Sequence, residues 1–333
     1  MAVRAVYLRL GAALLALAAG AVSIAVVLLL LRSEPGPVAN ATVAVAAASA
    51  GAASAAPTGG RIPTPTDPGF PSPPNGAIVL AREAGSDALG FALLPDRSRS
   101  LVRVSVINGA GSGAAGLRVS VAFGARRPLT LSACGAGCYQ RTVTPVPTRA
   151  VSIRLNATAY TLELPAAREP PDGSAVVTNA ARVWRGLTSL VWHERLASSA
   201  TNVLETTYEA VAPDELSYTI AGQSAAVIIG ETRWDRPSPT GGWVRSSQIP
   251  PVHVPVPFWY GVTDARVLAS GHVGPRAVWS VSFFDPTTPA WFTAEIDKQN
   301  GRTLELTMIA AGHFMHHRYL SFNTPIHLRP PTS

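Results

Sequence analysis

The chain has 333 residues, a formal net charge of +7, 14% charged residues, 29 Pro and 28 Gly. This many turn-forming residues with so few charges argues against a helical bundle and favours a mainly β fold. Lys298 is the only lysine, and the arginines are dispersed, with Arg126 and Arg127 the one adjacent pair. Dispersed charge argues against a nucleic-acid partner and suits weak attraction to an anionic membrane surface.

Residues 10–31 contain no charged side chain and end in four consecutive leucines. This length matches the ~20 apolar residues that cross a bilayer, so we expect a single transmembrane helix here. A cleaved signal peptide is the alternative, because the small residues after the span resemble a cleavage region. Arg4 and Arg9 precede the span and Arg32 follows it, which places residues 1–9 in the cytoplasm and the rest outside the cell membrane.

Residues 32–75 are rich in Ala, Gly, Ser and Pro and show no apolar periodicity. This composition is typical of an extended or flexible linker, which we expect to hold the folded parts away from the membrane.

Residues 76–165 show the alternation of short strands. Leu117, Val119 and Val121 alternate with polar side chains, and Val151 and Ile153 do the same further on. One apolar face per strand predicts two antiparallel sheets packed as a β-sandwich.

Cys134 and Cys138 are the only cysteines and lie in the sequence CGAGC. Three small residues between them allow a tight loop, and an extracytoplasmic location would allow oxidation, so we expect a disulfide. A soft metal site is the alternative.

The order FALLP, LRVSVAF, LTLSACGAGCY and YTLELP resembles the immunoglobulin-like domain found beside copper-resistance membrane proteins, which is related to a periplasmic copper carrier. The resemblance implies an immunoglobulin-like sandwich and a copper-handling membrane protein as a partner. The carrier family binds copper through His and Met, and residues 76–165 contain neither.

A polar hinge, residues 166–174, precedes an amphipathic stretch. Apolar residues recur at three- and four-residue spacing here, which predicts one helix over residues 178–198 with His193 near its end. Alternating segments then predict a curved antiparallel sheet over this helix. The segments are residues 202–211, 216–222, 225–236, 241–248, 263–271, 276–285, 290–297, 302–310 and 313–323.

Residues 175–330 resemble the outer-membrane lipoprotein-carrier superfamily, which includes mycobacterial lipid-binding lipoproteins. The matching features are a leading helix, the pattern of Pro213, Asp214, Leu216, Tyr218, Ile220 and Gly222, then IIGETRWDR, Gly242-Trp243, VWSVSFFDP, a hairpin between Ile296-Asp297 and Gly301-Arg302, and YLSFNTPIHL. The resemblance implies a half-barrel of about eleven strands over helices, with an acyl-chain cavity between them. One departure is the Pro-rich sequence IPPVHVPVPFWYG in place of lid helices.

Large apolar residues are frequent in this half of the chain, and most are expected to fill the core. A cavity left between them would favour an acyl chain. The candidate cavity residues are Trp184, Leu187, Val191, Tyr218, Trp234, Trp279 and Trp291.

The sequence HFMHH supplies the candidate metal ligands. In a strand, His313, Met315 and His317 share one face, with His316 on the other, and His with Met would suit copper. The alternative is a closing strand whose histidines lie at a solvated edge. No cofactor other than copper is indicated.

Catalytic motifs are absent from the sequence: it has no G-x-S-x-G, H-E-x-x-H or phosphate-binding Gly loop. We therefore expect a membrane-anchored, non-enzymatic protein that binds a lipid or other apolar molecule. The alternatives are an accessory of copper binding or resistance that uses the strand from His313 to His317, and a cell-envelope scaffold.

Overall fold

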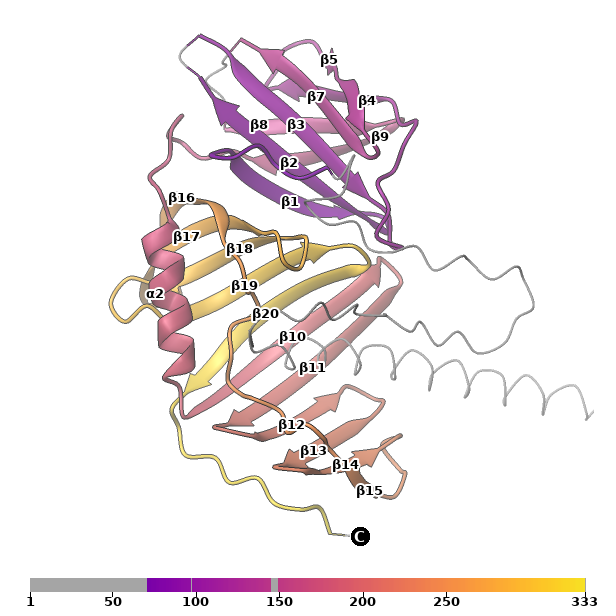
Figure 1. Cartoon of the computed structure of the whole chain (residues 1–333), viewed down its shortest axis with the longest axis vertical. Helices are drawn as coiled ribbons and strands as arrows, with labels where there is room; N and C mark the ends of the chain where they lie inside the picture. The colour runs from indigo at the N-terminus through magenta and orange to yellow at the C-terminus, as the bar shows by residue number, and fades with distance from the viewer. Residues whose placement is uncertain (1–70, 97, 145–148, 333) are drawn as a thin grey trace, which may run out of the picture.

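The computed structural model describes residues 71–96, 98–144 and 149–332. This part of the chain is mainly β, with three antiparallel sheets of five, four and eleven strands and one helix, α2 (Figure 1). None of its helices has the length and apolar character needed to span a bilayer. Residues 1–9, the predicted span and most of the linker lie outside the described residues, so membrane anchoring and orientation stay predictions.

Two sheets in the N-terminal half pack face to face, and we call this region the sandwich. Its core is formed by inward residues of both sheets, such as Val102 and Val104 of one and Val121 and Ile153 of the other. The strand orders are β1-β2-β3-β7-β6 and β5-β4-β8-β9. The strands are β1 (Ile78–Ala84), β2 (Asp87–Pro95), β3 (Ser100–Ile107), β4 (Val119–Phe123), β5 (Leu129–Thr130), β6 (Ser132–Gly135), β7 (Cys138–Val143), β8 (Ala150–Leu155) and β9 (Thr158–Glu163). A two-sheet arrangement is thus confirmed, whereas the immunoglobulin-like relationship stays a prediction.

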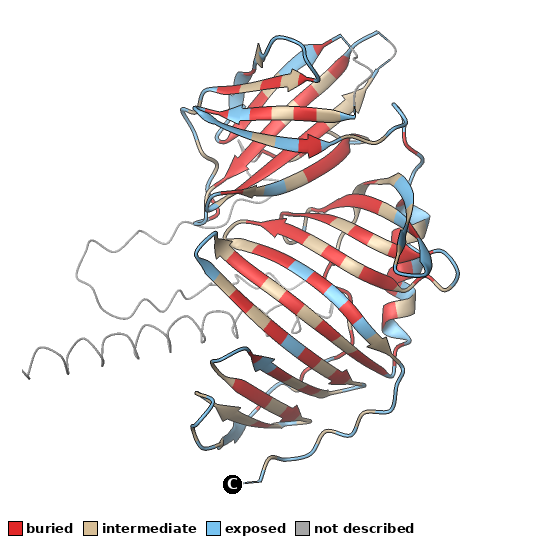
Figure 2. Cartoon of the chain, turned by 180° about the vertical axis from the view of Figure 1, so that it is seen from behind, coloured by how far each residue is buried: buried red, intermediate tan, exposed pale blue. Residues whose placement is uncertain are grey.

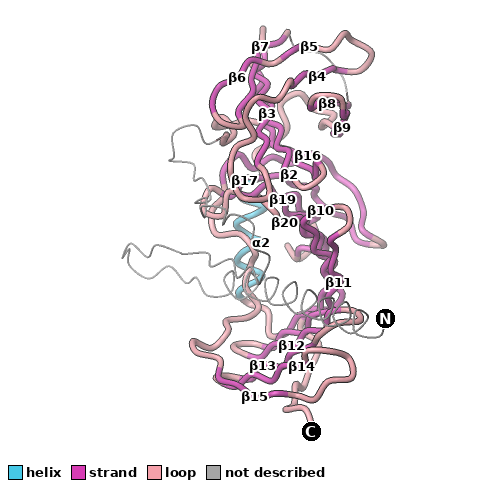
Figure 3. Tube along the Cα trace, turned by 90° about the vertical axis from the view of Figure 1, so that its right-hand side faces the viewer, coloured by secondary structure: helices cyan, strands magenta, loops and turns pink. Residues whose placement is uncertain are grey.

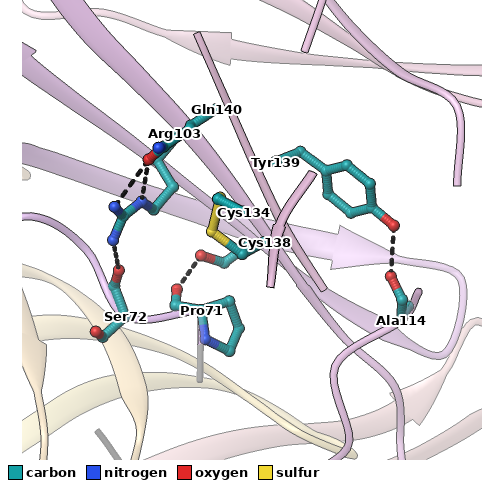
Figure 4. The surroundings of a disulfide bond; sticks show 9 residues. Pro71, Ser72, Arg103, Ala114, Cys134, Cys138, Tyr139 and Gln140 are labelled. Atoms are coloured by element: carbon teal, nitrogen blue, oxygen red, sulfur yellow. Dashed lines mark hydrogen bonds between the residues drawn. A yellow bond between two sulfur atoms is a disulfide. The ribbon is translucent and has the colours of Figure 1, made fainter. Parts of the chain in front are cut away.

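Cys134 and Cys138 form the predicted disulfide across the turn between β6 and β7 (Figure 4). Gly113 packs against this turn so closely that an added Cβ would lie 2.2 Å from the carbonyl oxygen of Ala136. Tyr139, next to the disulfide, donates its hydroxyl to the Ala114 carbonyl oxygen at 2.7 Å. The disulfide therefore lies in a turn of the sandwich that is also held by the packing of Gly113 and the hydrogen bond of Tyr139.

The helix is shorter than the sequence predicts, and this corrects the prediction of one helix over residues 178–198. α2 spans Ser174–Arg185, and residues 189–199 form strand β10 instead, with His193 inside the strand. Gly186 follows the last helical residue, and its N–H bonds to the Val183 carbonyl oxygen as the helix closes. From Leu190 onward every second side chain is turned inward, so a period of two replaces the helical period.

The remaining strands form one eleven-stranded sheet, which we call the large sheet, in the order β15-β14-β13-β12-β11-β10-β20-β19-β18-β17-β16. The predicted segment 225–236 is two strands joined by a turn at Gly230, whose φ is +56°. The strands are β10 (Ser189–Ser199), β11 (Asn202–Val211), β12 (Glu215–Ile220), β13 (Ala225–Ile229), β14 (Thr232–Arg236), β15 (Val244–Ser247), β16 (Thr263–Val273), β17 (Arg276–Asp285), β18 (Ala290–Asp297), β19 (Thr303–Ala310) and β20 (His313–Phe322). The strand number agrees with the half-barrel that the resemblance implies.

The large sheet curves around α2 (Figure 3), and we call the face toward α2 the concave face and the other the convex face. Successive side chains of each strand point to opposite faces of the sheet. Their differing burial appears as bands along the strands in the view from behind (Figure 2). The sandwich packs on the convex face, where Phe284, Trp291 and Phe314 meet small residues of β1 and β2. Trp291 lies directly over Gly90, where an added Cβ would be 2.4 Å from its ring.

Candidate functional site

The concave face of the large sheet is apolar and aromatic. The register sets the side chains of neighbouring strands opposite one another, for example Trp192 against Tyr208 and Met308 against Met315. α2 covers one part of this face with Val177, Ala180 and Trp184, and the indole Nε1 of Trp184 donates to Thr303 Oγ1 at 3.1 Å. A single 12-residue helix leaves much of an eleven-stranded face to be covered by something else.

Residues 249–262, which we call the cover segment, run across the concave face between β15 and β16 and form neither helix nor strand (Figure 1). Four apolar side chains of the segment are buried in the same core as α2: Val252, Val254, Phe258 and Trp259. In its middle, the N–H of Val254 donates to the Pro213 carbonyl oxygen at 2.9 Å. At its end, the buried Asp285 accepts the N–H groups of Tyr260 and Gly261 at 2.7 and 3.0 Å.

The rings of the cover segment fill the space between sheet and helix. Trp184 of α2 lies edge-on to Phe258 at 6.0 Å and to Trp259 at 6.4 Å between ring centroids. Phe258 in turn lies edge-on to Trp192 at 6.1 Å. The aromatic side chains of the cover segment therefore pack in the apolar core between α2 and the large sheet.

Under Phe258 lies a group of buried ionisable side chains. Glu194 on β10 is 1% exposed and His317 on β20 is 0% exposed, and His317 Nε2 lies 2.6 Å from Glu194 Oε2. The hydroxyl of Tyr208 donates to Glu194 Oε1 at 3.2 Å, and the hydroxyl of Tyr319 lies 3.0 Å from His317 Nδ1. Burial, followed by the nearby Glu194 charge, holds the pKa of both tyrosine hydroxyls well above the usual range.

A second buried polar group lies farther along the concave face on β14. Arg233 is 7% exposed and makes a forked contact with Asp235, with donor–acceptor distances of 2.6 to 2.9 Å. It also donates to the hydroxyl of Tyr218 at 2.7 Å. Burial lowers the pKa of Arg233, but the hydrogen bonds and charge of Asp235 outweigh burial and raise it overall. Burial raises the pKa of Tyr218 to about 12.

Two buried nitrogens on this face have no hydrogen-bond partner among the described residues. They are Nε1 of Trp192, a residue 4% exposed, and Nη1 of Arg233. An indole N–H without an acceptor in an apolar interior costs about 1–3 kcal/mol, so each unpaired donor calls for a physical explanation.

The candidate cavity residues divide between the two faces. Trp184, Leu187 and Tyr218 belong to the concave core, and their role in binding stays a prediction. Val191, Trp234 and Trp291 lie on the convex face, which corrects their assignment to the cavity. Val191 and Trp234 follow the opposite phase of alternation from Trp192 and Arg233, and Trp291 packs against the sandwich.

Trp279 is also outside the concave core. It lies near the start of β17 and is 36% exposed, with Lys298 Nζ 3.8 Å from the centre of its ring. This position corrects its assignment to the cavity as well.

The candidate copper ligands share the concave face, as strand alternation predicts. Met315 packs in the apolar core, and both ring nitrogens of His317 already lie near Glu194 and Tyr319. His313 is part-buried near the Ala311 carbonyl oxygen, and burial lowers its pKa. Within the described ranges, no three His, Cys, Asp or Glu side chains are grouped to hold a metal ion. Copper binding would require His317 to leave its present partners.

Sequence reasoning did not find Glu194, Tyr208 or Arg233, nor did it pair Glu194 with His317. The two members of that pair are 123 positions apart, and only the adjacency of β10 and β20 brings them together. One signal was available in the sequence: Glu194 is a charged residue in phase with Leu190, Trp192 and Leu196 on an otherwise apolar strand face.

No family model matches the chain, and no curated protein sequence is similar to it. Among solved structures, LprF from Mycobacterium bovis aligns over 49% of this chain and 100% of its own, with 10% identity and a TM-score of 0.37. An uncharacterized conserved protein from Thermus thermophilus aligns over 47% and 89%, with 12% identity and a TM-score of 0.30. A LolA superfamily protein from Nitrosomonas europaea aligns over 47% and 96%, with 9% identity and a TM-score of 0.24. At these scores the likenesses carry no functional argument, so the site is argued from its own geometry.

Proposed function

We propose that the protein binds an elongated apolar molecule, such as the acyl chain of a lipid, between the concave face of the large sheet and the cover segment. The observation that carries the proposal is the closure of an aromatic-lined sheet face by a segment with neither helix nor strand, through four inserted apolar side chains. A ligand that displaced Phe258 and Trp259 would recover the apolar contacts they make, at about 0.8 kcal/mol per buried methylene.

The way the cover segment is held supports this role. Its C-terminal end is fixed by Asp285, which accepts the N–H groups of Tyr260, Gly261 and Thr287. Among the described residues, the rest of the segment is held by the Val254 N–H bond to Pro213, by Gln248 Nε2, which donates to the Pro250 carbonyl oxygen at 3.0 Å, and by side-chain packing. When a ligand displaces the cover segment, its apolar contacts with the concave face would replace those of the segment. Few backbone hydrogen bonds would break in the exchange. The predicted span at residues 10–31 would keep this site near a bilayer, which is the source of such a ligand.

The proposal is tested by photolabelling the full-length chain in phosphatidylcholine liposomes with a methyl hexadecanoate derivative that carries a diazirine in its acyl chain. We expect labelled peptides from β10, β11 and β20. Phe258→Ala should increase the labelling, because it removes a ring that occupies the proposed binding volume without breaking a strand.

Phe284→Ala is the matched control, because Phe284 is equally large and buried but lies on the convex face against the sandwich. It should leave concave-face labelling unchanged. If neither the parent nor Phe258→Ala is labelled on these strands above the level of a denatured sample, the binding proposal fails and the scaffold hypothesis stands.

A further inference from the structure

We infer that the ligand carries a neutral hydrogen-bond acceptor, such as an ester or amide carbonyl, and that the indole N–H of Trp192 binds it. This inference rests on the proposed function and adds to it a chemical class of ligand. It starts from a contrast between two buried indoles that face the same core. Nε1 of Trp184 donates to Thr303 Oγ1 at 3.1 Å, whereas Nε1 of Trp192 has no acceptor among the described residues.

The polar side chains beside Trp192 bond to one another, and none of the described ones accepts from its indole. The Trp192 ring stacks flat on Tyr208, with 4.5 Å between centroids and 6° between planes. The hydroxyl of Tyr208 is engaged with Glu194, and Glu194 itself is engaged with His317. Among the described residues, these hydrogen bonds leave the Trp192 donor without an acceptor.

Phe258 of the cover segment lies over both parts of this group. Its ring is edge-on to Trp192 at 6.1 Å and to His317 at 4.4 Å. A molecule that replaced Phe258 would thus meet one unpaired donor beside a paired carboxylate and imidazole. A pure hydrocarbon would leave that donor unpaired, whereas a carbonyl oxygen would satisfy it and gain a hydrogen bond.

The sign of the local charge selects against an anionic group. Glu194 is fully buried, and a second carboxylate brought near it in a medium of low dielectric would be repelled. A neutral carbonyl has no such cost. The expected order of preference is therefore an acyl ester first, and the free carboxylate or the hydrocarbon after it.

The test uses three diazirine probes of equal chain length in phosphatidylcholine liposomes with the full-length chain: a methyl ester, a free carboxylate and a hydrocarbon. Labelling of β10 and β20 is measured for the parent and for Trp192→Phe, which keeps a ring on Tyr208 but removes the donor. Each probe is compared with itself between proteins, so its partition into the bilayer cancels. We expect Trp192→Phe to lower ester labelling about 2- to 10-fold relative to hydrocarbon labelling.

Trp184→Phe is the matched control, since it removes an indole N–H that already has a partner, and it should leave the ester-to-hydrocarbon ratio unchanged. Glu194→Gln provides a gain of signal that a misfolded protein would not show. Removing the buried negative charge should raise labelling by the free carboxylate relative to the ester.

The outcomes separate the two proposals. Labelling by all three probes with an ester-to-hydrocarbon ratio unaffected by Trp192→Phe, or carboxylate labelling that Glu194→Gln does not raise relative to the ester, would overturn the carbonyl inference and leave the apolar binding site in place. Absence of labelling by every probe would overturn the proposed function itself, and the inference with it.

Discussion

The cores of the sandwich and of the large sheet are built from different side chains. The sandwich core is mostly Val, Leu and Ile, and its buried polar residues in the described part are Ser100 and Ser105. The core of the large sheet contains rows of Trp, Tyr, Phe and Met, and it also encloses Glu194, His317 and Arg233.

Geometry accounts for the difference in ring content. Two sheets packed face to face lie ~10 Å apart, a gap that aliphatic side chains fill from both sides. In the part of the chain that the structure describes, no second sheet lies opposite the concave face, so aromatic rings, one helix and the cover segment fill a wider space. Packing does not account for a buried carboxylate and imidazole, because apolar residues of similar volume would serve as well or better. The comparison therefore favours the concave face, rather than the sandwich, as the place of the proposed binding site.

The largest expected effect comes from breaking the buried pair. Glu194→Leu should destabilise the protein by about 3–5 kcal/mol, because it leaves the imidazole of His317 buried without its partner. The double variant with His317→Leu should lose less than the sum of the two single variants, with a coupling of about 0.5–3 kcal/mol. Thermal unfolding of the four proteins measures this cycle.

Additive losses in that cycle would contradict the pairing and remove the main distinction between the two cores. A coupling as large as expected would show that Glu194 and His317 act as a unit inside the large sheet.

The sequence predicted the strands better than it predicted the faces. Alternation, together with the turn residues between segments, locates β16 to β20 to within a few residues. It does not decide which phase of a strand faces which side when both phases are apolar. Trp291 and Phe292 are both buried, one against the sandwich and the other in the concave core, and only the packing of the sandwich distinguishes them.

The boundary between α2 and β10 shows a second limit. Leu187, Leu190 and Val191 satisfy a helical period and also fit a helix end followed by a strand, so periodicity alone admits both. Gly186 is the local signal that favours a stop, because glycine is common where helices end. The Glu194–His317 contact depends on the pairing of β10 with β20, for which no local signal exists.

A smaller effect is expected where the two regions meet. Gly90→Ala should destabilise the protein by up to about 3 kcal/mol, because its Cβ would lie 2.4 Å from the Trp291 ring and force the interface apart. Gly271→Ala is the matched control: its Cβ would meet nothing within 4 Å and its φ is not positive, so stability should change by less than about 0.5 kcal/mol. Melting temperatures of both variants provide the measurement. Equal melting temperatures for parent and Gly90→Ala would mean that the sandwich does not rest on the large sheet through Trp291.

The smallest effect contrasts one carboxylate from each region through its pH dependence. Asp297, the last residue of β18, accepts hydrogen bonds from Arg276 at 2.8 Å and from the Gln299 N–H at 2.8 Å. Burial raises its pKa, but these donors outweigh burial and lower it overall. Asp87, at the start of β2 in the sandwich, has a pKa raised mainly by burial.

Because the two pKa values shift in opposite directions, substituting Asp297 and substituting Asp87 should change the stability at pH 7 with opposite signs. A lowered folded-state pKa means that ionised Asp297 stabilises the protein above the unfolded-state pKa of ~4, and that this stabilisation is lost as the pH falls through the folded-state pKa. Asp297→Asn should therefore cost about 1 kcal/mol at pH 7, where half-exposed Arg276 limits the gain, and almost nothing near pH 2. Because its pKa is raised, Asp87 is most favourable when protonated and loses that advantage as the pH rises, so Asp87→Asn should slightly raise stability at pH 7 and leave it unchanged in acid. Denaturant midpoints at the two pH values decide the matter, and losses of equal sign for both variants would show that burial and hydrogen bonding do not distinguish these two carboxylates.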